Sequence, residues 1–346
     1  MSTISPSPRT SPAAAARARI RQLNRVDRRA NLFLKSVAVI AAIIVALVLV
    51  DILIQIISGA SLAINTYGLG FIGKSDWNPT KFKLGGLPFI YGTLVTSLIS
   101  LVLATVLGLA SGLFLALMAP RSVSTVIGPL IELLAAIPTV ILGLIGILVI
   151  APFSQSTLEP ALHSVLGFIP LFGEVPSAGE SLLTASLVLT IMVVPIIASL
   201  SRDIFLTVPR DLMDGAEALG CTRWEMIRGV VFPTTKSGVT AACVLGFARA
   251  IGEAIAVTQV VGGDALVHAN LFLPGTTIGS VVAEEFNNSN NGLQTSALFY
   301  LILILFGFSV ATNLISNVIR AQGGNEKLLT RLRRRLTPAS HTAVAE

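Results

Sequence analysis

Charged residues are scarce in this chain. Asp, Glu, Lys and Arg make up only 12% of its 346 residues, while 53% are hydrophobic; soluble domains carry about 25% charged residues. Cysteine occurs twice, which excludes a disulfide framework or a cysteine-rich metal cluster. The three histidines show no ligand spacing, so we expect no metal site; they are His163, His268 and His341. The composition favours a membrane protein.

The sequence contains several long runs of apolar residues. The first covers residues 37–57, and at 1.5 Å per residue its length of about 31 Å is enough to span a bilayer. A cleaved signal peptide is the alternative, but its apolar core is only about 7–15 residues long. We predict an all-α polytopic membrane protein with six transmembrane helices, near residues 37–57, 88–118, 126–150, 181–201, 237–261 and 293–318.

These spans divide the chain into segments of different character. In order, they are a disordered basic cytoplasmic arm at 1–34, the first transmembrane helix at 35–58, an extracytoplasmic loop at 59–87, a transmembrane core at 88–319 that includes a charged cytoplasmic loop at 202–236, and a basic cytoplasmic tail at 320–346. We also expect polar or moderately apolar outer loops at 151–180 and 262–292.

Basic residues are distributed unequally across the predicted membrane. Of the 24 Lys and Arg residues, 20 fall in segments assigned to the cytoplasm. The outer loops hold Lys74, Lys81 and Lys83, and Arg249 lies inside a span. This asymmetry follows the positive-inside rule, so we expect a cell-membrane protein with both termini in the cytoplasm. The same distribution explains the net charge of +6 without a nucleic-acid partner.

Residues 68–75 read GLGFIGKS and satisfy the P-loop formula. A P-loop that cradles phosphate follows a strand and opens a helix with its lysine. Here an apolar span precedes the motif, and Asp-Trp-Asn-Pro follows it. We therefore predict a folded outer loop and no nucleotide site.

The charged loop at 202–236 has the pattern of two helices joined by a glycine elbow. Pro209 suits the first turn of a helix, and Gly220 can adopt the left-handed conformation that closes it. Thr222 and Glu225 have the spacing of a capping box, and we expect Pro233 to limit the second helix. A solvated connector is the alternative interpretation of this loop.

The spacing of this loop resembles the EAA signature of ABC-importer permeases, in which E-A-A precedes a glycine and then I-x-L-P. Ala216, Gly220 and Pro233 match it, whereas Asp214 and Gly215 depart from it, as do Val230 and Phe232. The resemblance implies a coupling helix that docks on an ATPase subunit. The residues that it assigns to ATPase coupling are Asp214, Gly215, Ala216, Glu217, Gly220, Thr222, Arg223, Trp224 and Pro233.

Two charges fall inside the predicted fifth span. Arg249 and Glu253 are four residues apart, so we expect both on one helix face. A charge at that depth costs about 2.5–3.5 kcal/mol on insertion scales. Either the two form an ion pair that locks the bundle, or Arg249 lies beside an anion route and Glu253 holds its orientation. Glu132, in the predicted third span, is a further pathway candidate that we expect to pair with Arg249.

Four separate segments carry a wider resemblance, which extends over most of residues 35–320. They are GTLVTSLISLVLATVLGLASGLFLA at 92–116, IELLAAIPTVILGLIG at 131–146, ALGCTRWEMIRGVVFP at 218–233 and LGFARAIGEAIAV at 245–257. Together with Trp77-Asn78-Pro79, they resemble the PstC family of phosphate ABC-importer permeases.

The resemblance implies a type I ABC importer permease fold and a role in moving phosphate delivered by an external binding protein. It implies a PstA-like sister permease, two PstB-like ATPase subunits and a PstS-like binding protein. The chain itself then has no catalytic residue and no cofactor, because the partner ATPase subunits bind ATP and Mg²⁺. In this family Arg249 and Glu253 correspond to residues of the phosphate pathway.

Two other functions stay open on the sequence alone. One is an importer permease for another oxyanion, such as sulfate or molybdate. The other is a secondary transporter, which often shows internal repeats that we do not find in this sequence, or a membrane signalling scaffold.

Overall fold

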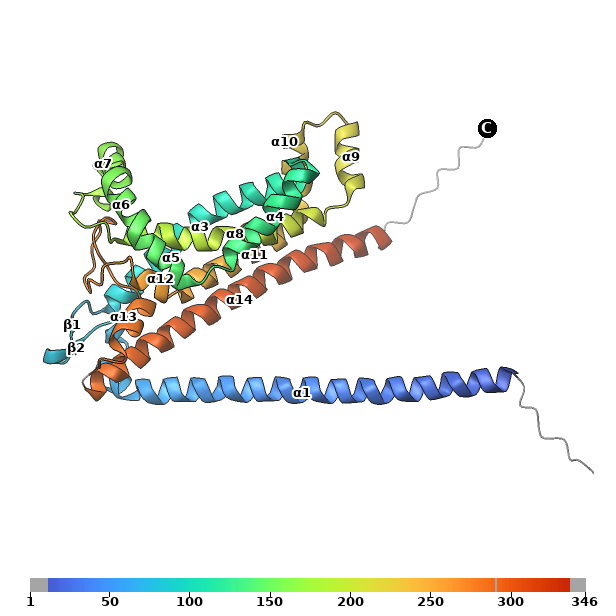
Figure 1. The fold of residues 1–346 in the computed structure, drawn as a ribbon, viewed down its shortest axis with the longest axis horizontal. Helices are drawn as coiled ribbons and strands as arrows, with labels where there is room; N and C mark the ends of the chain where they lie inside the picture. Colours follow the sequence, from blue (N-terminus) through green and yellow to red (C-terminus); the bar gives the residue numbers. More distant parts are fainter. Residues whose placement is uncertain (1–11, 290, 337–346) are drawn as a thin grey trace, which may run out of the picture. The chain divides into compact units, whose positions relative to one another are not determined.

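Helices make up most of the protein. The structure, a computed structural model, describes residues 12–289 and 291–336, and Figure 1 shows their arrangement. The chain divides into a first unit, Met1–Ser58, and a second, Gly59–Glu346. The first unit consists of most of α1 (Pro12–Tyr67), whose side chains from residue 31 to 57 are largely exposed.

The predicted disordered arm at 1–34 is helical from Pro12 onward. The physical reason lies in its sequence, since Pro12 suits the first turn and four alanines, the best helix formers, follow it. Residues 1–11 of the arm lie outside the described residues. At the other end, α14 (Gly292–Leu336) extends through the first part of the predicted tail, and residues 337–346, including His341, lie outside the described residues.

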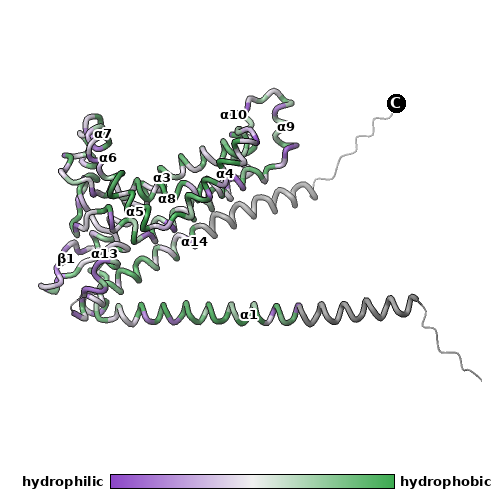
Figure 2. Tube along the Cα trace, viewed as in Figure 1, coloured by the Kyte–Doolittle hydropathy of each residue, from purple (hydrophilic) through white to green (hydrophobic). Residues whose placement is uncertain are grey.

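Six helical segments within the described residues are long and apolar enough to cross a membrane. They are Asn31–Tyr67, Leu87–Met118, Thr139–Leu166, Leu182–Leu206, Arg223–Gly252 and Gly292–Ile315. The all-α, six-span prediction is therefore confirmed. In Figure 2 the middle of the second unit is mostly hydrophobic, while the residues around α9 and α10 include many hydrophilic ones.

The third and fifth spans begin and end at residues other than those predicted. The region expected as one span at 126–150 holds α4 (Arg121–Ala135) and α5 (Thr139–Ile145), separated at Pro138. A residue that precedes proline is disfavoured in the α conformation, which explains the interruption. Much of the loop expected at 151–180 is instead helical as far as Leu166.

Three other prolines do not end their helices, because a wider turn precedes each of them. The π turns Gly146–Ile150, Ser154–Leu158 and Ile227–Val231 lie just before Pro152, Pro160 and Pro233. In each case the residue before the proline donates its N–H to the carbonyl five residues earlier. The wider turn relieves the clash that a proline ring makes with an α-helical carbonyl. Pro233 therefore does not limit the second elbow helix, as we expected, and α11 (Phe232–Gly252) continues through it.

The core of the second unit is built on α8 (Leu182–Leu206), in which 72% of the residues in the most apolar stretch are buried. It packs closely along α3 (Leu87–Leu113). A Cβ added at Gly108 would lie 2.8 Å from Cβ of Ile197, and one at Gly112 would lie 2.8 Å from the carbonyl oxygen of Ala198. These glycines allow the two backbones to approach, as small residues do between membrane helices.

At one end of the second unit a short hairpin packs beside several small helices (Figure 1). Its strands β1 (Trp77–Asn78) and β2 (Lys83–Leu84) are antiparallel, with Trp77 opposite Leu84, and η1 (Pro79–Lys81) joins them. Residues 68–75, which satisfy the P-loop formula, do not have the strand–loop–helix structure of a P-loop. No strand precedes residues 68–75 in this described part of the chain, and Lys74 follows α2 (Gly70–Gly73) instead of opening it.

The loop expected at 262–292 contains a helix that the sequence analysis missed. This is α13 (Ile278–Glu285), which begins with a capping box between Thr277 and Ser280. It follows α12 (Ile255–Thr258), and its first residues, Ile278, Gly279, Ser280 and Val281, are buried.

Candidate functional site

The elbow has the geometry that the sequence predicted. α9 (Arg210–Ala218) closes at Gly220, whose φ is +84°, and α10 (Arg223–Met226) follows. Cys221 N–H donates to the Ala216 carbonyl at 3.1 Å and Gly220 N–H donates to the Glu217 carbonyl at 2.9 Å. This is the Schellman pattern of helix closure. Pro209 takes the N-cap position of α9, one residue before the place that we expected.

The predicted capping box opens α10. The backbone N–H and the hydroxyl of Thr222 both donate to Oε2 of Glu225, each at 2.8 Å, and Thr222 Oγ1 accepts from Glu225 N–H at 3.3 Å. The reciprocal bonds satisfy backbone donors at the start of the helix. The turn between the two helices is therefore fixed at both ends.

A hydrophobic cluster anchors the elbow to the transmembrane helices. Its buried members are Phe205, Val208, Met226, Ile227, Val231 and Val239. From α9, the half-buried Met213 and Ala216 pack against it. The rings of Phe205 and Phe232 meet edge to face with their centroids 5.8 Å apart. A force applied to α9 would thus reach α8 and α11 through packed side chains.

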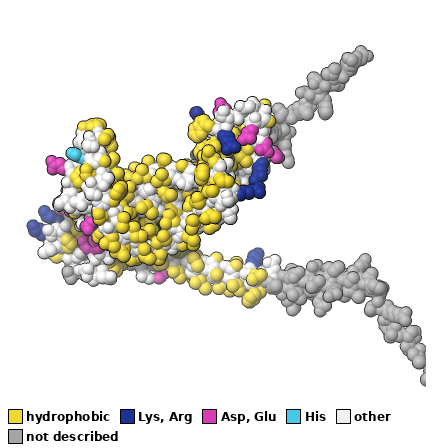
Figure 3. Space-filling model, turned by 45° about the horizontal axis from the view of Figure 1, so that its top comes forward, with side chains coloured by type: hydrophobic (Ala, Val, Ile, Leu, Met, Phe, Trp, Pro, Cys, Tyr) yellow, Lys and Arg dark blue, Asp and Glu magenta, His cyan; other side chains and the backbone are white. Residues whose placement is uncertain are grey.

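The outer face of the elbow is exposed and partly apolar. Trp224 is 63% exposed and Leu219 is 87% exposed. Both lie among exposed charges that include Asp214, Glu217 and Arg223, and Figure 3 shows basic and acidic side chains gathered at this end of the molecule. Aromatic and apolar side chains within a charged surface are typical of protein interfaces. The sequence analysis did not select Leu219, although its place beside Gly220 could have indicated an exposed position.

The prediction that Arg249 and Glu253 lie on one face of a helix is wrong. Arg249 is exposed in the last turn of α11, while Glu253 follows the helix in an extended conformation, with φ −77° and ψ 127°. In the part of the chain that the structure describes, no ion pair joins them. Gly252 weakens the helix at this point, and α13 crosses there. A Cβ at Gly279 would lie 2.9 Å from the Glu253 carbonyl oxygen.

Glu132 lies near the end of α4 and does not pair with Arg249. Its Oε1 lies 3.7 Å from Nη1 of Arg202 in α8. Arg202 is held by close packing, since a Cβ at Gly128 would lie 2.5 Å from the same Nη1. The sequence analysis counted Arg202 among the loop charges and gave it no partner.

Two interruptions in the helices come near one another. α4 and α5 are separated around Pro138, and α11 and α12 are separated at Glu253 and Ala254. α5 packs directly on α12, where a Cβ at Gly143 would lie 3.0 Å from Cα of Ala256. Non-helical backbone in an apolar region requires burial in protein or a water-filled cavity. This pair of interruptions, with Arg249 beside one of them, is the candidate pathway site.

The family model described as "Binding-protein-dependent transport system inner membrane component" matches residues 104–321. The matched region contains the elbow and both helix interruptions. The chain belongs to this family of inner membrane components.

Relatives of this permease family cover most of the chain. The Phosphate transport system permease protein PstC of Mesorhizobium japonicum is 40% identical over 81% of this chain and 86% of its own length. The protein of the same name from Xylella fastidiosa strain Temecula1 is 37% identical over 86% of this chain and 94% of its own length. That from Pasteurella multocida is 39% identical over 80% of this chain and 88% of its own length. The resemblance to PstC permeases seen in the sequence is thus confirmed, and the chain is a multi-pass membrane transport component.

Proposed function

We propose that this chain is the membrane-spanning permease subunit of an ATP-driven importer of inorganic phosphate. The observation that carries the proposal is the likeness to relatives named as phosphate transport system permeases, at up to 40% identity over 81% of the chain. The arrangement of an exposed arginine beside interrupted helices is consistent with an anion route through a membrane protein.

Arg249 is the residue that would meet the phosphate. Its side chain is exposed on the surface of this chain although it lies in the apolar segment Arg223–Gly252. A guanidinium there needs water or a polar partner instead of lipid, which favours a face shared with a sister permease. Its planar donors match the oxygens of phosphate. Glu253, on the extended segment beyond the helix, limits by like charge how tightly the anion is held.

The elbow is the part that would receive work from ATP hydrolysis. Two PstB-like ATPase subunits would bind ATP and Mg²⁺ and would contact the exposed face of α9 and α10. Because Met213 and Ala216 pack on the cluster beneath them, closure of the ATPase pair would move the elbow as a rigid body. The chain would need no cofactor of its own.

The orientation follows from the unequal distribution of basic residues. Both termini and the elbow would lie in the cytoplasm, and the hairpin at 77–84 would face outward. A PstA-like sister permease would complete the pathway, and a PstS-like protein would deliver phosphate at the outer face.

The test is uptake of radiolabelled phosphate by the complex reconstituted in proteoliposomes that contain ATP. We expect uptake to require the binding protein and the ATPase subunits, and to resist an excess of sulfate or molybdate. If sulfate or molybdate abolishes uptake and is itself carried, the cargo is another oxyanion. Uphill transport by the chain without any ATPase would identify a secondary transporter instead.

A further inference from the structure

The outer hairpin, residues 77–84, exposes the residues at its tip. Phe82 at the tip adopts φ +54°, a left-handed conformation that is unusual for a bulky residue, and its side chain is 59% exposed. The hydroxyl of Tyr67 donates to the Phe82 carbonyl at 2.6 Å, and the neighbours of Phe82 in the sequence, Lys81 and Lys83, are exposed cations. An exposed aromatic between two cations suits a protein surface with an apolar hollow rimmed by acids.

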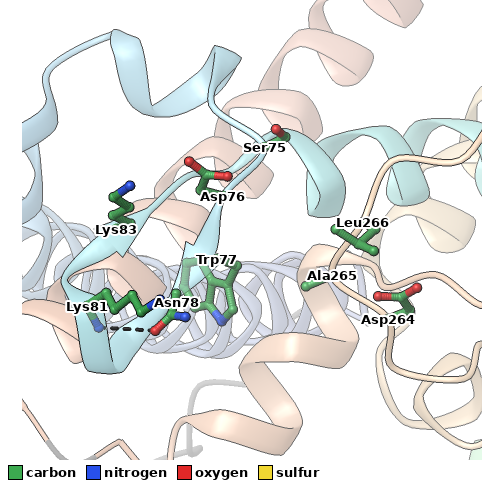
Figure 4. Close-up of a pocket in the computed structure, with 9 residues that line it drawn as sticks. All are labelled: Ser75, Asp76, Trp77, Asn78, Lys81, Lys83, Asp264, Ala265 and Leu266. Carbon is green, nitrogen blue, oxygen red and sulfur yellow. Dashed lines mark hydrogen bonds between the residues drawn. The ribbon is translucent and has the colours of Figure 1, made fainter.

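A pocket of about 430 Å³ lies between this hairpin and the loop residues 264–266. Figure 4 shows Trp77 on the hairpin side of the pocket and Asp264 on the facing loop. The pocket is far larger than one phosphate ion, so a loop of a docking protein suits it better. Because Trp77 belongs to the hairpin and also lines the pocket, a partner that moves the hairpin or fills the pocket would displace Trp77.

Trp77 connects the hairpin to α13. Its indole Nε1–H donates to both carboxylate oxygens of Glu285, at 3.0 and 3.2 Å. Gln294, at the start of α14, donates to Oε2 of the same carboxylate at 2.9 Å. The ring of Trp77 also packs edge to face on the buried Phe89, with the centroids 4.7 Å apart. Hydrogen bonds to a carboxylate are stronger than neutral ones, so Glu285 fixes the outer end of α13.

The other end of α13 lies against the interruption that carries Glu253. A Cβ at Gly279 would lie 2.9 Å from the Glu253 carbonyl oxygen and 3.0 Å from Cα of Ala254. Near the same end, Ile278 N–H donates to Oγ1 of Thr93 in α3 at 2.9 Å. With its 8 residues, α13 is about 12 Å long at 1.5 Å per residue. One short, capped helix thus contacts the hairpin at one end and the candidate pathway at the other.

We propose that α13 is a lever that transmits docking of the external binding protein from the outer hairpin to the helix interruption at Glu253 and Ala254, with Glu285 as the positioning residue at its outer end. This proposal rests on the proposed function for the identity of the docking protein. The internal coupling rests on the contacts of Trp77, Glu285 and Gly279 alone.

The first experiment measures the coupling without reference to cargo. In the full complex in detergent, backbone hydrogen exchange of residues 254–258 is compared between the unmodified chain, Trp77→Phe and Glu285→Gln. Glu285→Gln keeps the size of the side chain but removes its charge, and Trp77→Phe keeps an aromatic ring but removes the indole N–H donor. Both weaken the Trp77–Glu285 contact, and we expect exchange to rise about 5- to 10-fold. Tyr67→Phe is the matched control, because it removes a hydrogen bond to the hairpin that does not reach α13. Exchange that stays unchanged in both variants overturns the lever.

The second experiment places the lever in the transport cycle. Glu285→Gln should reduce the stimulation of ATP hydrolysis by saturating binding protein, and leave basal hydrolysis and complex assembly unchanged. The double variant with Trp77→Phe should be no worse than the more severe single variant, because both act on one contact. Additive losses, or normal stimulation in both single variants, contradict the proposal. If the variants alter exchange but the unmodified complex carries no phosphate, the proposed function is refuted and the lever remains.

Discussion

Oε1 of Glu132 lies 3.7 Å from Nη1 of Arg202, and this contact joins α4 to α8. Glu132 is 56% exposed and Arg202 is 21% exposed in this pair. Exposed ion pairs contribute at most about 1 kcal/mol. The ion pair therefore adds little to the packing between the two helices, which includes the close approach of Arg202 to Gly128.

We predict that Gly128→Ala destabilises the complex more than Glu132→Gln. The added methyl would lie 2.5 Å from Nη1 of Arg202, so the flexible end of that side chain must move. The change then disturbs both the ion pair with Glu132 and the packing of Arg202 on α4, whereas Glu132→Gln removes only the charge. Thermal unfolding of the purified complex measures the order of the two effects. Glu132→Gln should also keep most phosphate uptake. If it abolishes uptake in a fully assembled complex, Glu132 belongs to the pathway as the sequence first indicated.

At the elbow, Gly220→Ala should weaken the assembly of the permease with its ATPase subunits. The cost comes only from the backbone, since φ is +84° and no atom lies within 4 Å of the added Cβ. We expect a cost of about 1 kcal/mol in elbow stability. Gly307→Ala is the control, because that site is equally open and lies within α14, away from the elbow. Co-purification of the ATPase should fall for the first variant and not for the second; equal losses would mean that conformation at Gly220 is unimportant.

Trp224 should be an anchor of the ATPase interface. It is 63% exposed on α10, and truncation of a central interface tryptophan costs about 2 kcal/mol or more. Trp224→Ala should therefore weaken ATPase binding by roughly 30-fold, measured by surface-immobilised titration in detergent. Val165→Ala, at a 71% exposed site on α7 (Glu159–Leu166), serves as the control. Unchanged affinity in the tryptophan variant would show that the ATPase does not dock on α10.

Near the lever, partial loss of hydration and the neighbouring Glu285 carboxylate raise the pKa of Glu284 above its ordinary value of 4.5. A carboxyl whose pKa is raised by folding favours the folded state below its ordinary pKa, and this benefit is lost as pH rises through the raised value. Glu284→Gln should thus increase the unfolding temperature slightly at pH 7 and lose this advantage near pH 4. An advantage that grows in acid would contradict the assigned direction.

Local signals in the sequence predicted the elbow well, because its geometry depends on neighbouring residues. The capping box at Thr222 and the left-handed Gly220 need no distant partner. Proline was a poorer guide. Pro138 interrupts a helix, whereas Pro233 is accommodated by a π turn that the sequence does not reveal.

The candidate pathway was harder to predict because its geometry is set by contacts between distant segments. Arg249 and Glu253 have helical spacing, but Gly279 of α13 crosses at that point and the helix ends. The partner of Glu132 also comes from another helix, in Arg202. Periodicity finds an amphipathic face, but it does not indicate which helix a charged residue will meet.

The central claim is that a membrane guanidinium contacts the phosphate carried by this permease. It is tested most directly by ATP-dependent phosphate uptake in proteoliposomes that contain the complete complex with Arg249→Ala. We predict that uptake is lost while assembly and basal ATP hydrolysis persist, and that Arg249→Lys restores only part of it because lysine lacks the planar fork of donors. Normal phosphate uptake by the Arg249→Ala complex would contradict the account.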